Sequence, residues 1–284
     1  MIHMRPSVPE DVPRQRELWA LAFGDSGDYL DNFYQTYYRP ERVLVLEEAG
    51  TVLAMTAWFD TALAEPGRER WKAGYLYAVA THPDARGRGL AGALLKYAAF
   101  YLREEQGCQA MTTVPAEPSL HRFFARNGFR ECFTHTRLTP APAPAAAEPS
   151  FPLEPLSPEE YGRVREELLA GLLHIVYPAD ALAYQAGCCR LSGGGLYLAR
   201  TAAGPALLCA EGGEGGALLV KELLGCPGAQ ALVLPCLKTL LPGWSGAARV
   251  PGPGTEFGML QWLYPGLEAR WDWSAEGYLG LAFD

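Results

Sequence analysis

A proline- and alanine-rich stretch divides the chain into two halves of similar length. Residues 138–156 read LTPAPAPAAAEPSFPLEPL. Each proline removes a backbone N–H donor and fixes φ, so we expect neither a helix nor a sheet to continue through this stretch. A helix start follows, with Ser157 as cap, Pro158 in the first turn and Glu160 at the third position. The sequence therefore predicts two folding units, residues 1–137 and 157–284, joined by a linker at 138–156.

The length and the charge of the chain agree with this division and exclude some functions. A chain of 284 residues is long enough for two domains. Its net charge of −8 argues against a general nucleic-acid binder, because no basic excess is present to release counterions. Residues 1–140 carry 16 basic and 17 acidic side chains, whereas residues 141–284 carry 8 and 15. The acidic second half would attract a cationic amine, or serve solubility alone.

The cysteine pattern and the hydropathy indicate a cytoplasmic protein. None of the seven cysteines has a CxxC spacing, and the five histidines do not cluster with them. We therefore expect reduced, buried thiols and neither a metal site nor a disulfide framework. The N-terminus has no basic segment followed by an apolar run, and no long uninterrupted apolar stretch is present. We accordingly expect neither a signal peptide nor contact with a membrane.

Hydrophobic periodicity and turn residues predict mixed α/β structure in both halves. In the first half we expect helices at residues 7–23, 28–38, 88–106 and 118–127, and strands at 42–48, 51–63, 72–81, 110–114 and 129–138. In the second half we expect helices at 158–173 and 180–186, and strands at 195–200, 205–211, 216–224, 231–234 and 278–283.

One segment of the first half is typical of an anion site. An apolar strand ends at Ala78-Val79-Ala80-Thr81, and the long helix opens with Arg86-Gly87-Arg88-Gly89-Leu90-Ala91. Glycines let the backbone approach a ligand closely, the amides at a helix start point outward, and the helix dipole favours negative charge there. Two arginines add full charges suited to phosphate oxygens. The segment predicts a pyrophosphate site, and the alternative is a tight loop with solvated arginines.

Two motifs, in this order and spacing, resemble those of the GNAT N-acetyltransferase superfamily. Motif A, R/Q-x-x-G-x-G/A, is matched by Arg86, Gly89 and Ala91, and residues 119–129, SLHRFFARNGF, resemble motif B, which ends in Gly-Phe. The resemblance covers roughly residues 3–137 and implies the GNAT fold, an α/β (α+β) arrangement in which helices flank a mixed central sheet. It is similar to the Eis-type branch, which adds a second GNAT-like domain.

The resemblance also implies acetyl-CoA as the cofactor and assigns its contacts. The backbone of Val79, Ala80 and Thr81 would hydrogen-bond the pantetheine arm. Ser119 occupies the motif B position from which a serine or asparagine often approaches the cofactor. The CoA pyrophosphate would be held by the amides of the motif A turn, namely those of Arg86, Gly87, Arg88, Gly89, Leu90 and Ala91.

Phe124 departs from the family pattern. Many members carry a tyrosine four positions before the motif B glycine, where it protonates the departing CoA thiolate, and phenylalanine has no proton to donate. General acid catalysis typically raises the reaction rate about 10²–10⁴-fold. A thiol with a pKa of about 8.5 is already a tolerable leaving group as the thiolate, so the reaction does not strictly require the acid. The substitution is compatible with a slower enzyme, with another acid or with a lost activity.

The base that deprotonates the incoming amine has no strong candidate. Tyr75 and Tyr77 share one face of the strand that enters the site, and core packing is their alternative role. In the Eis-type branch the terminal carboxylate can reach the acceptor site, so Asp284 would bring two carboxyl groups, unless the end is merely frayed. Weaker candidates, more typical of turn or solvated positions, are His82, His121 and Glu117.

The second half shows no such cofactor turn. Residues 216–224 are similar to the strand before motif A, yet Gly225-Cys226-Pro227-Gly228 follows, and the prolines of Pro251-Gly252-Pro253-Gly254 remove amide donors. We expect a degenerate GNAT-like domain without the CoA loop, or an unrelated α/β domain, that walls off the acceptor cleft. Four tryptophans could line that cleft or lie in the core: Trp244, Trp262, Trp271 and Trp273.

The function that follows is an acyl-CoA-dependent N-acyltransferase. The simplest form transfers acetyl to a small-molecule or peptide amine, which attacks the thioester directly. The alternative is a CoA-binding sensor that has lost catalysis, and a scaffold without CoA affinity is a third possibility. The sequence leaves the identity of the acceptor open.

Overall fold

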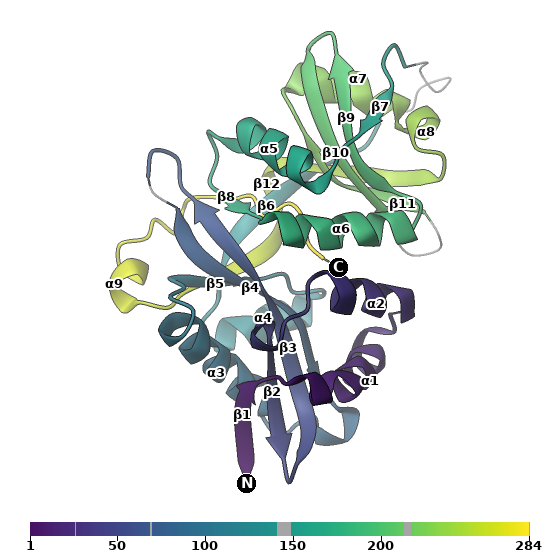
Figure 1. Cartoon of the computed structure of the whole chain (residues 1–284). Coiled ribbons are helices and arrows are strands. Elements are labelled where there is room, and N and C mark those ends of the chain that lie inside the picture. Colours follow the sequence, from purple (N-terminus) through teal and green to yellow (C-terminus); the bar gives the residue numbers. More distant parts are fainter. Residues whose placement is uncertain (26, 69, 141–148, 213–216, 284) are drawn as a thin grey trace. The chain divides into compact units, whose positions relative to one another are not determined.

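A computed structural model describes residues 1–25, 27–68, 70–140, 149–212 and 217–283 (Figure 1). The chain forms two compact units. Unit 1 comprises Met1–Leu63, Arg70–Cys132 and Gly258–Trp273, and unit 2 comprises Ala64–Glu69, Phe133–Phe257 and Ser274–Asp284. The units differ from the linear division at residues 138–156, because Gly258–Trp273 folds with unit 1.

Unit 1 is built on a mixed sheet, as the sequence predicts. Its strands lie in the order β1-β2-β3-β4-β5-β12, and only the pair β4 and β5 is parallel. The strands are β1 (Ile2–Pro6), β2 (Val43–Glu48), β3 (Thr51–Ala64), β4 (Trp71–Thr81), β5 (Ala110–Thr113) and the last residues of β12 (Trp244–Trp262). The helices are α1 (Val12–Phe23), α2 (Gly27–Thr36), α3 (Leu90–Glu104), α4 (Pro118–Arg126) and α9 (Pro265–Glu268), with 3₁₀ turns at Pro9–Asp11, Pro40–Arg42 and Pro83–Ala85.

The helices of unit 1 cover both faces of this sheet, with α1 and α2 on one side and α3 on the other (Figure 1). Helix α3 buries Leu90, Leu94 and Leu95 in a cluster that includes Leu76 of β4 and Met111 of β5. Successive residues of a strand point to opposite faces, so Tyr75 and Tyr77 face α1 and α2, where aromatic rings surround them. Strand β4 is therefore packed on both sides.

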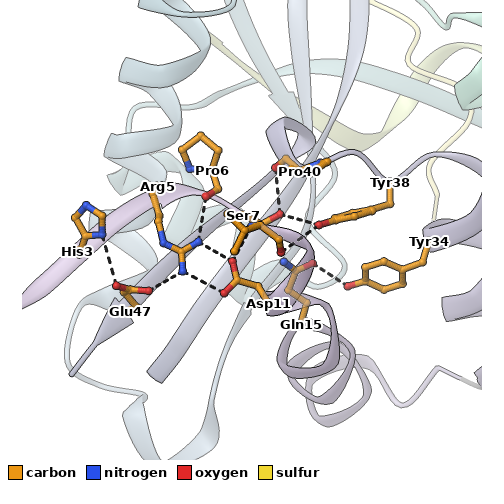
Figure 2. A network of polar contacts seen from close by, with 11 residues as sticks. His3, Arg5, Pro6, Ser7, Asp11, Gln15, Tyr34, Tyr38, Pro40 and Glu47 are labelled. Carbon is orange, nitrogen blue, oxygen red and sulfur yellow. Dashed lines mark hydrogen bonds and ion pairs between the residues drawn. The ribbon is translucent and has the colours of Figure 1, made fainter. Parts of the chain in front are cut away.

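The N-terminal region differs from the prediction in two ways. Residues 2–6 form strand β1, which was not expected, and α1 begins at Val12 rather than at residue 7. The Asp11 carboxylate accepts hydrogen bonds from Val8 N at 2.8 Å and from the Arg5 guanidinium at 2.6 and 3.1 Å (Figure 2). Ser7, the expected cap, instead donates its hydroxyl proton to Pro40 O at 3.1 Å. These contacts fix the end of β1 and the 3₁₀ turn Pro9–Asp11 that leads into α1.

Unit 2 also contains a mixed sheet, in the order β7-β9-β10-β11-β12. Strands β11 and β12 are parallel, as β4 and β5 are, and the other pairs are antiparallel. Its strands are β6 (Arg130–Leu138), β7 (Leu153–Pro155), β8 (His174–Val176), β9 (Gly195–Thr201), β10 (Gly204–Gly212), β11 (Leu218–Leu224) and most of β12. Its helices are α5 (Pro158–Leu169), α6 (Ala179–Leu191), α7 (Pro227–Val233) and α8 (Leu237–Leu240), with a 3₁₀ turn at Leu234–Cys236.

Four features of the linker and the second half differ from the sequence predictions. Strand β7 lies inside the proline-rich stretch that was expected to contain no strand. It is the edge strand next to β9, and an edge strand tolerates proline because proline's missing N–H can face away from the sheet. Residues 231–234 belong to α7 and the following 3₁₀ turn. Residues 278–283 make one isolated bridge at Tyr278 rather than a strand. The proline- and glycine-rich residues 251–254 lie within β12, which the sequence reading did not predict.

A charged pair is buried inside unit 2. Arg165 of α5 and Glu222 of β11 are 1% and 0% exposed, and Arg165 Nε donates to both carboxylate oxygens at 3.1 and 3.0 Å. Tyr161 OH donates to Glu222 Oε2 at 2.7 Å, and the other guanidinium nitrogens donate to Ile175 O and Leu279 O. The pair therefore joins α5, β11 and the buried C-terminal segment.

The thiols are mostly buried, as expected. Of the seven cysteines only Cys226 is exposed. Burial raises the pKa of Cys108, Cys132 and Cys188 to about 12, because an apolar environment disfavours the thiolate. In the part of the chain that the structure describes, no helix is long and apolar enough to cross a membrane.

Candidate functional site

The turn before α3 has a backbone that favours glycine at two positions. Gly87 and Gly89 both have φ of +77°, in the left-handed region, and Gly89 is the N-cap of α3. A Cβ at either position would meet no atom within 4 Å. The backbone conformation, and not close packing, therefore favours glycine at both positions. The space beside the two glycines is open to a ligand.

The backbone amides of this turn form a donor set without acceptors. Arg86 N donates to Pro83 O at 3.2 Å, and the first helical bond runs from Ala93 N to Gly89 O at 3.1 Å. Among the described residues no acceptor is bonded to the amides of residues 87–92. The free donors thus begin at Gly87, one residue later than the sequence reading placed them. With the helix dipole behind them, they fit a pyrophosphate.

Strand β4 continues beyond its parallel partner. The pairing with β5 runs from Ala73–Ala110 to Leu76–Thr113, whereas β4 continues to Thr81. Ala78 has φ of +50°, and the register against β3 shifts there, so β4 contains a bulge. The edge of β4 after Leu76 is consequently free of β5, and an extended ligand arm can pair with it.

Val79, Ala80 and Thr81 lie on this free edge. Ala80 is buried, and Val79 packs against the apolar cluster under α3. The Thr81 hydroxyl is buried without a hydrogen-bond partner among the described residues, and Thr81 O accepts from Arg86 Nε at 3.3 Å. This contact links the end of β4 to the glycine turn.

The two arginines of the turn have different surroundings. Arg86 contacts only the backbone of Thr81 among the hydrogen bonds of the described residues. Arg88 is engaged by Glu48 at the end of β2, since its Nη2 donates to both carboxylate oxygens at 2.9 and 2.8 Å. The sequence reading missed Glu48, because only the β2–β4 arrangement brings it to the turn.

Motif B lies beside the turn. Phe124 of α4 and Leu90 of α3 belong to one apolar cluster, and a Cβ on Gly92 would lie 3.2 Å from Asn127 Oδ1. The Phe124 ring is 5% exposed and packs 5.4 Å from the Phe129 ring. Ser119 is exposed, and its hydroxyl donates to the Glu117 carboxylate. The structure therefore brings the two motifs together, with Phe124 in the core.

Tyr77 lies in an aromatic cluster immediately before the bulge. Its ring centroid is 5.3 Å from that of Trp19 and 5.5 Å from that of Phe59. Trp19 Nε1 donates to Asp25 Oδ2 at 2.7 Å, which holds a half-buried carboxylate on the α1–α2 side. The sequence reading missed Asp25, because its only local signal is its position after the α1 C-cap Gly24.

The remaining candidates are engaged elsewhere or not described. His82 Nδ1 accepts from Asp84 N at 3.4 Å, and His121 Nδ1 lies 2.9 Å from Glu131 Oε1. Tyr75 is buried in the core. Asp284 lies outside the described residues. Within the described ranges, no group of three potential ligands could hold a metal ion.

Comparison with known proteins gives a match for the domain that contains this site. Residues 3–131 match the family model of the acetyltransferase (GNAT) domain. Comparison with curated protein sequences gives no match.

Solved structures share the fold of nearly the whole chain. A GCN5-related N-acetyltransferase from Kribbella flavida is 16% identical with a TM-score of 0.64, over 92% of this chain and 71% of that one. Eis1 from Mycobacterium abscessus is 14% identical with a TM-score of 0.65, over 93% of this chain and 74% of that one. A GCN5-related N-acetyltransferase from Anabaena variabilis is also 14% identical with a TM-score of 0.65, over 93% of this chain and 73% of that one. Residues 3–131 therefore form a GNAT acetyltransferase domain, and nearly the whole chain shares its fold with these three solved structures.

Proposed function

We propose that the protein is an acetyl-CoA-dependent N-acetyltransferase that acylates an amine. The observation that carries the proposal is the turn of Gly87 and Gly89, whose amides have no acceptor among the described residues, next to the part of β4 that extends beyond its pairing with β5. A pyrophosphate and an extended arm are what these two features fit. The family model over residues 3–131 supports the same reading.

The proposed roles follow from these positions. The amides of Gly87, Arg88, Gly89, Leu90 and Ala91 hold the pyrophosphate, and Arg86 adds a charge. The edge from Val79 to Thr81 binds the pantetheine arm and orients the acyl carbonyl. Bound acetyl-CoA supplies an activated acyl thioester.

The base remains a prediction. Tyr77 and Asp284 are the candidates from the sequence, and the Asp25 carboxylate joins them because Trp19 holds it on the Tyr77 side of β4. A carboxylate there suits a cationic amine, which must lose a proton before it attacks a carbonyl carbon.

The direct test measures free thiol. Purified protein incubated with acetyl-CoA and a panel of primary amines is expected to release CoA only when an acceptor is present. Acetylated amine identified by mass spectrometry would confirm the transfer. Absence of CoA binding at millimolar concentration would overturn the proposal.

A second function, a non-catalytic CoA-binding module, is favoured by Phe124. Its buried ring takes the place of the usual proton donor. CoA binding without turnover on any amine would support this reading.

The Phe124→Tyr variant separates the two functions. If only the acid is missing, kcat is expected to rise about 10²-fold or more, the range of general acid catalysis. Phe123→Tyr is the matched control, because Phe123 lies on the same helix and its ring packs against Phe124 at 5.2 Å. Unchanged turnover in Phe124→Tyr, with CoA binding retained, would favour the binding module.

A further inference from the structure

Arg88 already has an anionic partner in the protein. Its Nη2 donates to both oxygens of Glu48, and the two side chains are 44% and 33% exposed. Glu48 is the last residue of β2. The Arg88 guanidinium, which would bind a phosphate in the motif, is therefore already bound to the Glu48 carboxylate of unit 1.

The neighbouring carboxylate is engaged elsewhere. Successive residues of a strand point to opposite sides, and Glu47 accepts from Arg5 Nη2 at 2.7 Å and lies 3.6 Å from His3 Nδ1 (Figure 2). Arg5 in turn contacts Asp11. Of the two adjacent glutamates, only Glu48 is paired with the glycine turn.

The pairing connects a negative charge to the turn that carries the free amides. Arg88 lies between Gly87 and Gly89, so its guanidinium links the Glu48 carboxylate to the turn that carries the donors for a pyrophosphate. A phosphate entering this turn is repelled by Glu48 and competes with it for the guanidinium. The ion pair is exposed, so its rupture costs little and competition is possible.

We propose that Glu48 is an internal competitor of the cofactor pyrophosphate and sets how tightly CoA is held. This inference rests on the proposed function. Free CoA, the product of acyl transfer, carries the same pyrophosphate as the substrate and must leave before another turnover. A carboxylate that recaptures Arg88 weakens both complexes and favours release of the product.

The test compares two adjacent substitutions by isothermal titration with CoA. Glu48→Gln keeps the side-chain size and removes the charge, and it is expected to tighten CoA binding about three- to tenfold. Glu47→Gln is the matched control and is expected to leave the affinity unchanged. In an Arg88→Ala background, the gain from Glu48→Gln is expected to shrink, because the competition acts through Arg88.

The outcomes are distinguishable. Unchanged or weaker CoA binding in Glu48→Gln would overturn the inference and leave the proposed function intact. An equal gain in Glu47→Gln, or an undiminished gain in the Arg88→Ala background, would also overturn it. Wild-type protein that does not bind CoA at millimolar concentration would overturn the proposed function, and the inference with it.

Discussion

Replacing Gly89 by alanine is expected to weaken CoA binding roughly 10- to 100-fold. Gly89 has φ of +77°, and a Cβ in that conformation costs about 1–2 kcal/mol per residue. The turn relieves this strain by moving out of the left-handed region, which turns the amides at the start of α3 away from a common point. Hydrogen bonds to charged groups contribute about 1.5–3 kcal/mol each, so the loss of one of them gives an effect of this size. Isothermal titration with CoA measures it.

Gly107→Ala is the matched control. Gly107 follows the other end of α3, has φ of +66° and also meets no atom within 4 Å of a Cβ. The two substitutions are expected to lower the free energy of unfolding by similar amounts, whereas only Gly89→Ala weakens CoA binding. Equal CoA affinity in the two variants would show that the cofactor does not use the glycine turn.

Replacing Arg165 by methionine is expected to lower the free energy of unfolding by about 3–5 kcal/mol, the cost of leaving a buried charge without its partner. Glu222 is 0% exposed, and Arg165 Nε donates to both its oxygens. Guanidinium unfolding monitored by circular dichroism measures the change. The variant also loses the donors to Ile175 O and Leu279 O.

Arg163→Met on the same helix is the control. Arg163 donates to Glu167 at 2.8 Å, but the two side chains are 65% and 63% exposed. An exposed pair of this kind contributes about 0.3–0.5 kcal/mol. The double variant Arg165→Met/Glu222→Leu is expected to recover part of the stability, because it removes the unpaired charge. A loss in Arg165→Met no larger than in Arg163→Met would contradict the buried-pair account.

The parts of the site that are local in sequence could be predicted. The apolar residues 90, 94, 95, 98 and 102 recur at helical spacing, and α3 buries them all. The glycine turn was predicted from the glycines and arginines between an apolar strand and a long helix, and both glycines have a backbone that favours glycine. The start of α5 was predicted from Ser157, which accepts a hydrogen bond from Glu160 N.

The parts that depend on long-range pairing could not be predicted. Strand β12 contains Pro251 and Pro253, which argue against a strand, yet its last residues pair with β5. Residues 231–234 are apolar enough for a strand but follow Pro227, which starts a helix. For β12 the partner strand outweighs the local preference, whereas for residues 231–234 the helix start at Pro227 outweighs the apolar run.

The sequence by itself determined the glycine turn, the helix behind it and the order of the two motifs, because these depend on φ, on capping and on spacing along the chain. Only the tertiary structure decided which charges meet. Glu48 is 40 residues from Arg88, and Glu222 is 57 residues from Arg165. The strand register and the helix packing bring these pairs together, and an ion pair depends on distance in space rather than along the chain.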